Sequence, residues 1–406
     1  MLLVLLLGLL FLREPRLEQS EEIFLHWLLT NSQPGGAVAP LTVVEIGHDS
    51  ILGSETDVES SGSKREGVSA ASPLELALFL QSVLVFQPTV VAFENVLKWR
   101  EREKDQEQVF IDQAMRVPRL LLAAELTATP DPDAPGPEIP GFTQVTGKRG
   151  DLVEFSGIGR QPNEDMRLIA TAGFINLPDE IADGIHVPLL FRYRGEVIPS
   201  FALEAILLWL RVTPAEVQID LGSQISLPQG RRIPIREDGT LLISPNAGKK
   251  VRRISLNELL LGAQQRDAGK APSDPFEAMR DQIILARTPL NPLSPPDVFA
   301  ATLATIQSNA YVYRVSWVFD CAFLLIVTVL MGNLRNVSRA DLLLGGIAFT
   351  AAYCLTALAV VSRWLIWLPG WLPLGAVWLL ILISIIAPRW NRAERHDVLV
   401  IPPPIP

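Results

Sequence analysis

Long apolar runs stand near both ends of the chain, and the region between them alternates apolar and polar positions over shorter distances. A run of about 20 apolar residues can cross the ~30 Å hydrocarbon core of a bilayer as a helix. Three late runs reach that length once their flanks are included, and they predict three transmembrane helices within residues 317–387: Trp317–Met331, Leu342–Val361 and Leu368–Ala387.

The first apolar run, residues 1–12, is too short to cross a bilayer. As a helix it would cover only roughly 18 Å. Two interpretations fit it: the apolar part of a signal peptide, or an anchor helix that begins upstream of Met1. No basic residues precede the run and no Ala-x-Ala-like cleavage site follows it, so we favour the anchor.

Arginine placement predicts the membrane topology, because positively charged loops stay in the cytoplasm. Arg335 and Arg339 lie between the first two late runs, and three arginines follow the third run at 389, 392 and 395. We therefore expect an inner or plasma membrane protein with residues 332–341 and 388–406 in the cytoplasm and residues 13–316 outside. Three buried helices of a soluble protein are the alternative, which the nearly charge-free runs disfavour.

Asp320 interrupts the first late run, and an ionisable residue within a membrane span usually has a partner. Under the expected topology, Arg363 lies at the same interface, at the end of the next span. We expect the two side chains to pair; the alternative is that Asp320 reaches the headgroups or is partly protonated.

Between the apolar ends, β-rich runs alternate with helical patterns, as in α/β domains. Strands are expected at 42–47, 89–93, 119–124 and 282–286, and shorter ones at 216–220, 232–236 and 240–244. Helices are expected at 17–30, after Ser72-Pro73, at 106–115, 201–210, 256–261 and 295–308. Residues 127–165 are rich in Pro, Gly and Asp and are expected to form a long loop or insertion. The sequence therefore predicts an α/β domain with a mixed sheet, in which the N-terminal part of the domain forms a parallel layer.

Charge and cysteine content narrow the functional classes. Residues 13–316 contain 29 Lys and Arg against 40 Asp and Glu, a net charge of −11, which argues against nucleic-acid binding. The two cysteines, Cys321 and Cys354, both lie in apolar runs, so no disulfide framework is expected.

Polar residues follow three of the expected strands where each one ends. Ligands of open α/β sheets bind outside the carboxyl ends of the strands, and this makes six residues candidates for a ligand site: His48, Asp49, Glu94, Asn95, Arg287 and Thr288. The alternative is that they are helix caps and solvated loop residues. Glu45 also stands out within an apolar strand, and we expect it to pair with a buried arginine or to lie at a sheet edge.

Motifs for catalysis or metal binding do not stand out in the sequence. The four histidines are not at ligand spacing, and the chain has no phosphate-binding glycine loop, nucleophile elbow or HExxH. We therefore expect no metal, no cofactor and no enzymatic activity. Two alternatives stay open: a hydrolase-like enzyme that uses Asp49 and Glu94 as paired acids, and a structural assembly subunit of the envelope.

The order of these elements resembles the type-two CHASE domain, an extracytoplasmic sensory module of bacterial receptors. The resemblance rests on segments in this order: Ile46–Ser50, Pro88–Glu94, Gly173–Pro178, Asp183-Gly184, Pro188–Leu190, Pro199–Ala205, Ile233–Ile235 before Asp238-Gly239, Ile254-Ser255, Leu259-Leu260 and Ala300–Ile306. It covers nearly the whole chain, and about three membrane helices normally follow such a domain.

The resemblance implies four regions: an anchor or signal segment at 1–12, a sensory domain at 13–316, three transmembrane helices at 317–387 and a short cytoplasmic tail at 388–406. Because members often continue into a cytoplasmic output domain and only residues 388–406 follow here, we expect signalling through a protein partner, reached by the membrane helices or the ectodomain. The expected partners are thus the membrane, a second protein and an unidentified small ligand, and a homo-oligomer with further copies of the chain is an open alternative.

Overall fold

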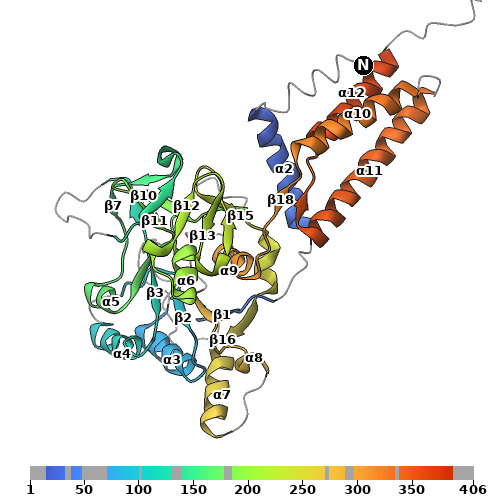
Figure 1. Ribbon diagram of the computed structural model, residues 1–406. Helices are drawn as coiled ribbons and strands as arrows, with labels where there is room; N and C mark the ends of the chain where they lie inside the picture. Colours follow the sequence, from blue (N-terminus) through green and yellow to red (C-terminus); the bar gives the residue numbers. More distant parts are fainter. Residues whose placement is uncertain are drawn as a thin grey trace, which may run out of the picture. The chain divides into compact units, whose positions relative to one another are not determined.

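The computed structural model describes residues 15–32, 38–47, 71–99, 103–129, 139–177, 185–269, 274–288, 297–333 and 338–386 (Figure 1). These residues form two compact units. One, the sheet unit, comprises Leu29–Val312 with Ser362–Leu365. The other, the membrane-region unit, comprises Met1–Leu28, Tyr313–Val361 and Ile366–Pro406. The expected anchor at 1–12 and the tail from 388 lie outside the described residues.

A six-stranded sheet is the centre of the Leu29–Val312 unit. Its strands lie in the order β16 (Arg252–Ser255), β1 (Leu41–Glu45), β17 (Ile283–Arg287), β2 (Val90–Phe93), β3 (Leu120–Ala124) and β8 (Thr171–Phe174). Every neighbouring pair is parallel. The expectation of an α/β domain with a parallel layer is confirmed, whereas the mixed sheet is wrong for this central sheet.

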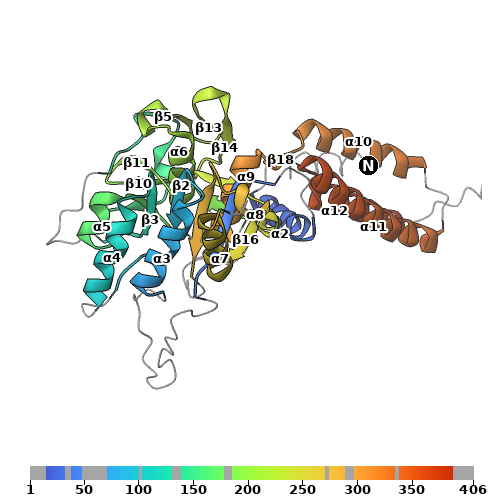
Figure 2. The same ribbon diagram turned by 90° about the horizontal axis from the view of Figure 1, so that it is seen from below.

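Helices cover both faces of the central sheet, which explains why its strands are continuous apolar runs. Alternate residues of each strand point to opposite faces: Val43 and Leu285 join one core cluster, and Val44 and Ile284 join the other. Helices α3 (Pro73–Leu84), α4 (Lys104–Ala114) and α7 (Leu256–Asp267) contribute to the second cluster; α6 (Phe201–Leu210) and α9 (Val298–Ser308) contribute to the first (Figures 1 and 2).

Local sequence signals set where these helices begin. Ser72 caps α3 through a capping box with Glu75, and Pro73 occupies the first helical position. Ser255 and Glu258 form the same arrangement at α7, and Ser200 caps α6. These caps satisfy backbone N–H groups that a helix leaves unpaired.

Two smaller sheets combine parallel and antiparallel pairing. One contains β11 (Glu196–Pro199), β10 (Leu190–Tyr193) and β6 (Glu154–Phe155); the other contains β14 (Arg232–Pro234), β13 (Gln224–Ser226), β12 (Gln218–Asp220) and β5 (Gln144–Thr146). The two-stranded pairs are β15 (Thr240–Leu242) with β9 (His186–Pro188), β4 (Leu126–Thr127) with β7 (Gly157–Ile158) and, in the membrane-region unit, β18 (Tyr313–Arg314) with β19 (Ile366–Trp367). The second half of 127–165, expected to form a long loop or insertion, contains β5, β6, β7 and the start of α5 (Glu164–Ile169), so it is not a plain loop.

The other unit contains the apolar helices α10 (Trp317–Asn333), α11 (Arg339–Trp364) and α12 (Trp371–Ile386). Of the described helices, only α11 is both long and apolar enough to cross a membrane. Helices α10 and α12 have 17 and 16 residues. The expectation of membrane-length helices is thus confirmed for α11.

Helix α2 (Pro15–Asn31) contributes a buried carboxylate to this unit. Glu21 accepts hydrogen bonds from the backbone N–H groups of Gly370, Trp371 and Leu372, at 2.7, 2.8 and 3.2 Å. Trp371 and Leu372 begin α12, so Glu21 satisfies the free N–H groups of that helix and lies at the positive end of its dipole. The N-terminal helix is in this way joined to the last membrane-region helix.

Glu204 is a buried acid within α6 of the sheet unit, and its carboxylate has no ion-pair or hydrogen-bond partner among the described residues. Burial raises the pKa of Glu204 to about 7. The folded state therefore binds its proton more tightly than the unfolded state does. The resulting stability is present below pH 4.5 and is lost as the pH rises through 7.

We predict that Glu204→Gln raises the free energy of unfolding at pH 8 by roughly 2–3 kcal/mol relative to its effect at pH 5. Thermal unfolding at both pH values measures this difference. Glu237→Gln, at an exposed glutamate, serves as the control and should change little at either pH. An equal effect of Glu204→Gln at both pH values would contradict the prediction.

Candidate functional site

The carboxyl ends of three neighbouring strands bring charged residues to one edge of the central sheet. Glu45 ends β1 and Arg287 ends β17, and these two residues are paired in the register. Ala286 is paired with Phe93, the last residue of β2, so Glu94 follows β2 beside Arg287. β17 is the last strand of this sheet in chain order, yet it lies between β1 and β2. The strand order changes direction at this point, where open α/β sheets bind ligands.

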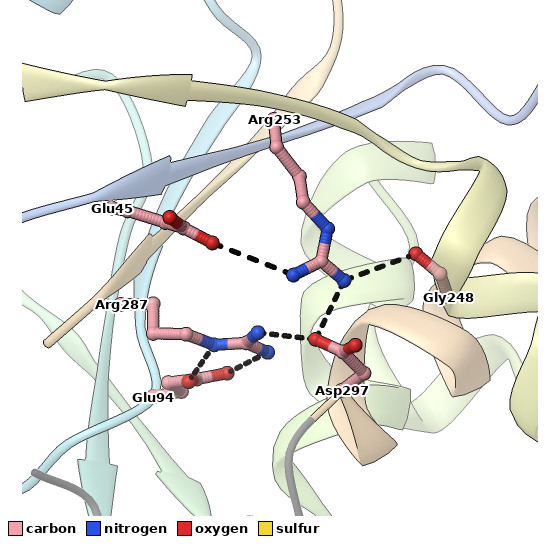
Figure 3. Close-up of polar contacts among 6 residues, drawn as sticks. All are labelled: Glu45, Glu94, Gly248, Arg253, Arg287 and Asp297. Atoms are coloured by element: carbon pink, nitrogen blue, oxygen red, sulfur yellow. Dashed lines mark hydrogen bonds and ion pairs between the residues drawn. The ribbon is translucent and has the colours of Figure 1, made fainter. Parts of the chain in front are cut away.

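Arg287 is the centre of a partly buried ion-pair network (Figure 3). Its Nε and Nη2 donate to the two carboxylate oxygens of Glu94, at 2.6 and 3.3 Å. Its Nη1 donates to Oδ1 of Asp297, the residue that precedes α9. The Glu94 side chain is 3% exposed and the Arg287 side chain is 15% exposed. The two charges therefore depend on each other for compensation.

Arg253 of β16 extends the network from the other side of Asp297 (Figure 3). Its Nη2 lies 2.6 Å from Asp297 Oδ1 and donates to the Gly248 carbonyl at 3.2 Å. Its Nη1 lies 3.4 Å from Glu45 Oε1, so Glu45 has an arginine partner, which is exposed and not, as expected, buried. Among the described residues, the network's three carboxylates and two guanidiniums carry a formal charge of −1.

Burial and ion pairing act in opposite directions on the pKa values of three members of the network, Asp297, Arg287 and Glu94. Burial by itself would raise the pKa of Asp297, but the guanidiniums of Arg253 and Arg287 hold it below its ordinary value. Burial would lower the pKa of Arg287, and Glu94 and Asp297 raise it instead. Burial raises the pKa of Glu94 although Arg287 opposes the shift. Arg287 itself stays charged, since arginine keeps its proton in proteins.

Two buried polar atoms beside the network have no hydrogen-bond partner among the described residues: Oδ1 of Asn95 and Oγ1 of Thr288. Asn95 follows Glu94, and Thr288 follows Arg287 and is buried. Native proteins pair nearly all buried polar atoms, because each one left unpaired costs stability. Two such atoms after adjacent, hydrogen-bonded strands mark this edge as able to accept a further polar group.

The structure brings together four of the six candidate residues: Glu94, Asn95, Arg287 and Thr288. His48 and Asp49 lie outside the described residues. Sequence reasoning missed Arg253 and Asp297. Arg253 lies in β16, whose alternation is too short to predict a strand, and Asp297 was placed inside a helix that in fact begins at Val298.

The polar groups of the membrane-region unit make different contacts. Asp320 Oδ2 lies 3.8 Å from Arg314 Nη2, and the Asp320 side chain is buried. The Arg314 guanidinium also lies over the Trp367 ring, at 5.3 Å from its centroid. Arg363 belongs to the segment Ser362–Leu365 of the sheet unit, and its guanidinium lies 6.0 Å from the centroid of the Trp364 ring. A pair between Asp320 and Arg363 stays a prediction.

We predict that Arg287→Met lowers the free energy of unfolding by about 3 kcal/mol, because it leaves Glu94 buried and uncompensated. Adding Glu94→Met should recover part of this loss. Arg192→Met is the matched control, because Arg192 pairs with the half-exposed Glu154. Its loss should cost less than ~1 kcal/mol. Urea unfolding measures all four proteins, and equal losses for the two single arginine variants would refute the prediction.

The comparisons with known proteins agree with this architecture. The CHASE2 domain matches residues 1–288, a span that contains the whole central sheet and ends at Thr288. No curated protein and no solved structure matches the chain. Domains of this family are extracytoplasmic, sensory and typically non-catalytic. The chain therefore belongs to the CHASE2 domain family.

Proposed function

We propose that this protein is a membrane-anchored sensor that passes its signal to a partner protein. It binds a small polar ligand at the carboxyl ends of β1, β17 and β2, which we call the strand-end site. The observation that carries the proposal is the pair of unpaired buried atoms, Asn95 Oδ1 and Thr288 Oγ1, beside a fully paired charge network. His48 and Asp49 follow β1 in sequence and lie outside the described residues.

The chemistry of this edge favours a ligand that donates hydrogen bonds. The amide oxygen of Asn95 only accepts, and the hydroxyl of Thr288 can accept or donate. The charges of Glu94, Arg287 and Asp297 already compensate one another, so a strongly charged ligand would have to break ion pairs on entry. The formal charge of −1 makes an anion less favourable than a neutral or weakly cationic molecule.

Asp297 offers a route by which binding could reach the membrane region. It connects Arg287 and Arg253 to the first residue of α9, and its carbonyl accepts from the Ala301 N–H. Helix α9 ends at Ser308, and α10 begins at Trp317. A ligand that shifts Arg287 would therefore act on a helix that is separated from the first membrane-region helix by only a short segment of chain.

The finer topology is part of the same proposal. We infer three membrane spans, at α10, α11 and α12, with residues 13–316 outside and 332–341 and 388–406 in the cytoplasm. Large apolar side chains exposed on all three helices support it, including Leu325, Leu344 and Ile386. These faces can contact lipid or the helices of a partner or of a second copy.

The hydrolase alternative requires Glu94 to act as an acid, base or nucleophile together with Asp49. The Glu94 carboxylate is instead in bidentate contact with Arg287, which leaves it poorly placed to exchange a proton. A purely structural subunit would have no reason to keep Asn95 and Thr288 unpaired. Both observations favour the sensor.

We predict the topology from single cysteines in a variant without Cys321 and Cys354. A cysteine at Ser223, an exposed residue of the sheet unit, should react with an impermeant maleimide in whole cells. A cysteine at Ser338 should react only after the membrane is permeabilised. Labelling of Ser338 with protection of Ser223 would reverse the proposed orientation.

We predict that Thr288→Val raises the thermal midpoint of the full chain in the absence of ligand, because it removes an unpaired buried hydroxyl that costs roughly 1–2 kcal/mol. A thermal-shift screen of amino acids, sugars and polyols should give compounds that stabilise the wild type and lose their effect in Thr288→Val and Asn95→Ala. Ser223→Ala is the control and should keep the shift. Compounds that stabilise all four proteins equally would place the ligand elsewhere.

A further inference from the structure

A second site candidate lies beside β8, an edge strand of the central sheet. A cavity of about 390 Å³ is lined there by residues of β3, β8, α5 and α6, and most of its wall is apolar. Small-molecule sites usually have volumes of ~300–1,000 Å³ and combine apolar walls with a few polar groups. This cavity contains none of the strand-end residues described above.

Glu204 is the acid among the residues that line this cavity. It lies in the first turn of α6, after the cap residue Ser200, and is nine-tenths buried. Its carboxylate has no hydrogen-bond or ion-pair partner among the described residues, and burial alone raises its pKa. A buried acid without a partner in an apolar wall lowers the stability of the protein. We therefore infer that a bound molecule, and not a residue of the chain, pairs with Glu204.

Few other ionisable groups can compensate Glu204. Arg167 of α5 is the one other charged residue among the described residues that line the cavity, and it is exposed. The elements packed against α6 are α9, β2, β3, β8 and β11, and between their bounds only β11 contains an ionisable residue, the exposed Glu196. The local field therefore comes chiefly from Glu204 itself.

We propose that this cavity is a binding site for an apolar molecule that carries one protonated amine, with the amine paired to the Glu204 carboxylate. The apolar walls, which include Leu122, Ala124 and Phe174, would take the body of the ligand. An ammonium group supplies both the charge and the hydrogen-bond donors that Glu204 lacks, whereas an alcohol supplies one donor and no charge. The site is independent of the proposed strand-end site.

Phenethylamine is a suitable probe, because its ring fits an apolar cavity and its amine stays protonated near neutral pH. Isothermal titration of the full chain in detergent should show saturable binding at one site. 2-Phenylethanol, of the same shape without the charge, should bind at least tenfold more weakly, and phenylacetate should not bind. The affinity for phenethylamine should rise between pH 5.5 and pH 8, as Glu204 ionises.

Two variants separate the Glu204 pair from general apolar binding. Glu204→Gln should weaken phenethylamine at least tenfold and leave 2-phenylethanol unchanged. Ala172→Phe, at an exposed cavity residue of β8, should weaken both probes without removing the carboxylate, and it keeps the test valid if Glu204→Gln does not fold. Glu237→Gln is the control and should bind as the wild type does.

Equal affinities for phenethylamine and 2-phenylethanol, or full binding by Glu204→Gln, would overturn the proposal. No saturable binding by the wild type would overturn it as well. None of these results bears on the strand-end site, because that site is tested separately with Asn95 and Thr288.

Discussion

The buried guanidinium of Arg287 is the constraint on which the strand-end site depends. It neutralises Glu94, which has almost no contact with solvent, and it also contacts Asp297 before α9. Three segments far apart in the sequence therefore meet at one charge: the end of β17, the residue after β2 and the start of α9. Buried ion pairs contribute little net stability, but losing one partner is costly. The network thus fixes the geometry of this edge more than it stabilises the fold.

In the membrane-region unit, too, buried acidic side chains lie close to groups that can compensate their charge. Glu21 of α2 accepts three backbone N–H groups at the start of α12, and Asp320 has Arg314 within 3.8 Å. Polar atoms at the ends of apolar helices are costly in a membrane unless they are paired. The pairing joins segments from both ends of the chain. Asp320 Oδ1 and Trp367 Nε1 nevertheless have no hydrogen-bond partner among the described residues, so the pairing in this unit is incomplete.

Much of the fold could be predicted from local patterns. The apolar runs of β1, β2, β3 and β17 and the Ser-Pro start of α3 are signals within a few residues of each other, and the structure confirms them. Register and strand order depend on distant contacts, so neither β17 between β1 and β2 nor the role of Arg253 could be read from the sequence. Glu204 was equally hidden, because one acid in an apolar helix has no pattern that distinguishes a buried position from an exposed one. The strand-end candidates Glu94, Asn95, Arg287 and Thr288 could be found because parallel strands end at a common edge.

We infer that Arg287 couples the strand ends to α9. Hydrogen–deuterium exchange of the full chain tests this coupling most directly. In Arg287→Met, the amides of residues 298–308 should lose protection by tenfold or more, while those of α3, in the other core cluster, keep theirs. Unchanged protection of α9, or an equal loss in α9 and α3, would contradict the claim.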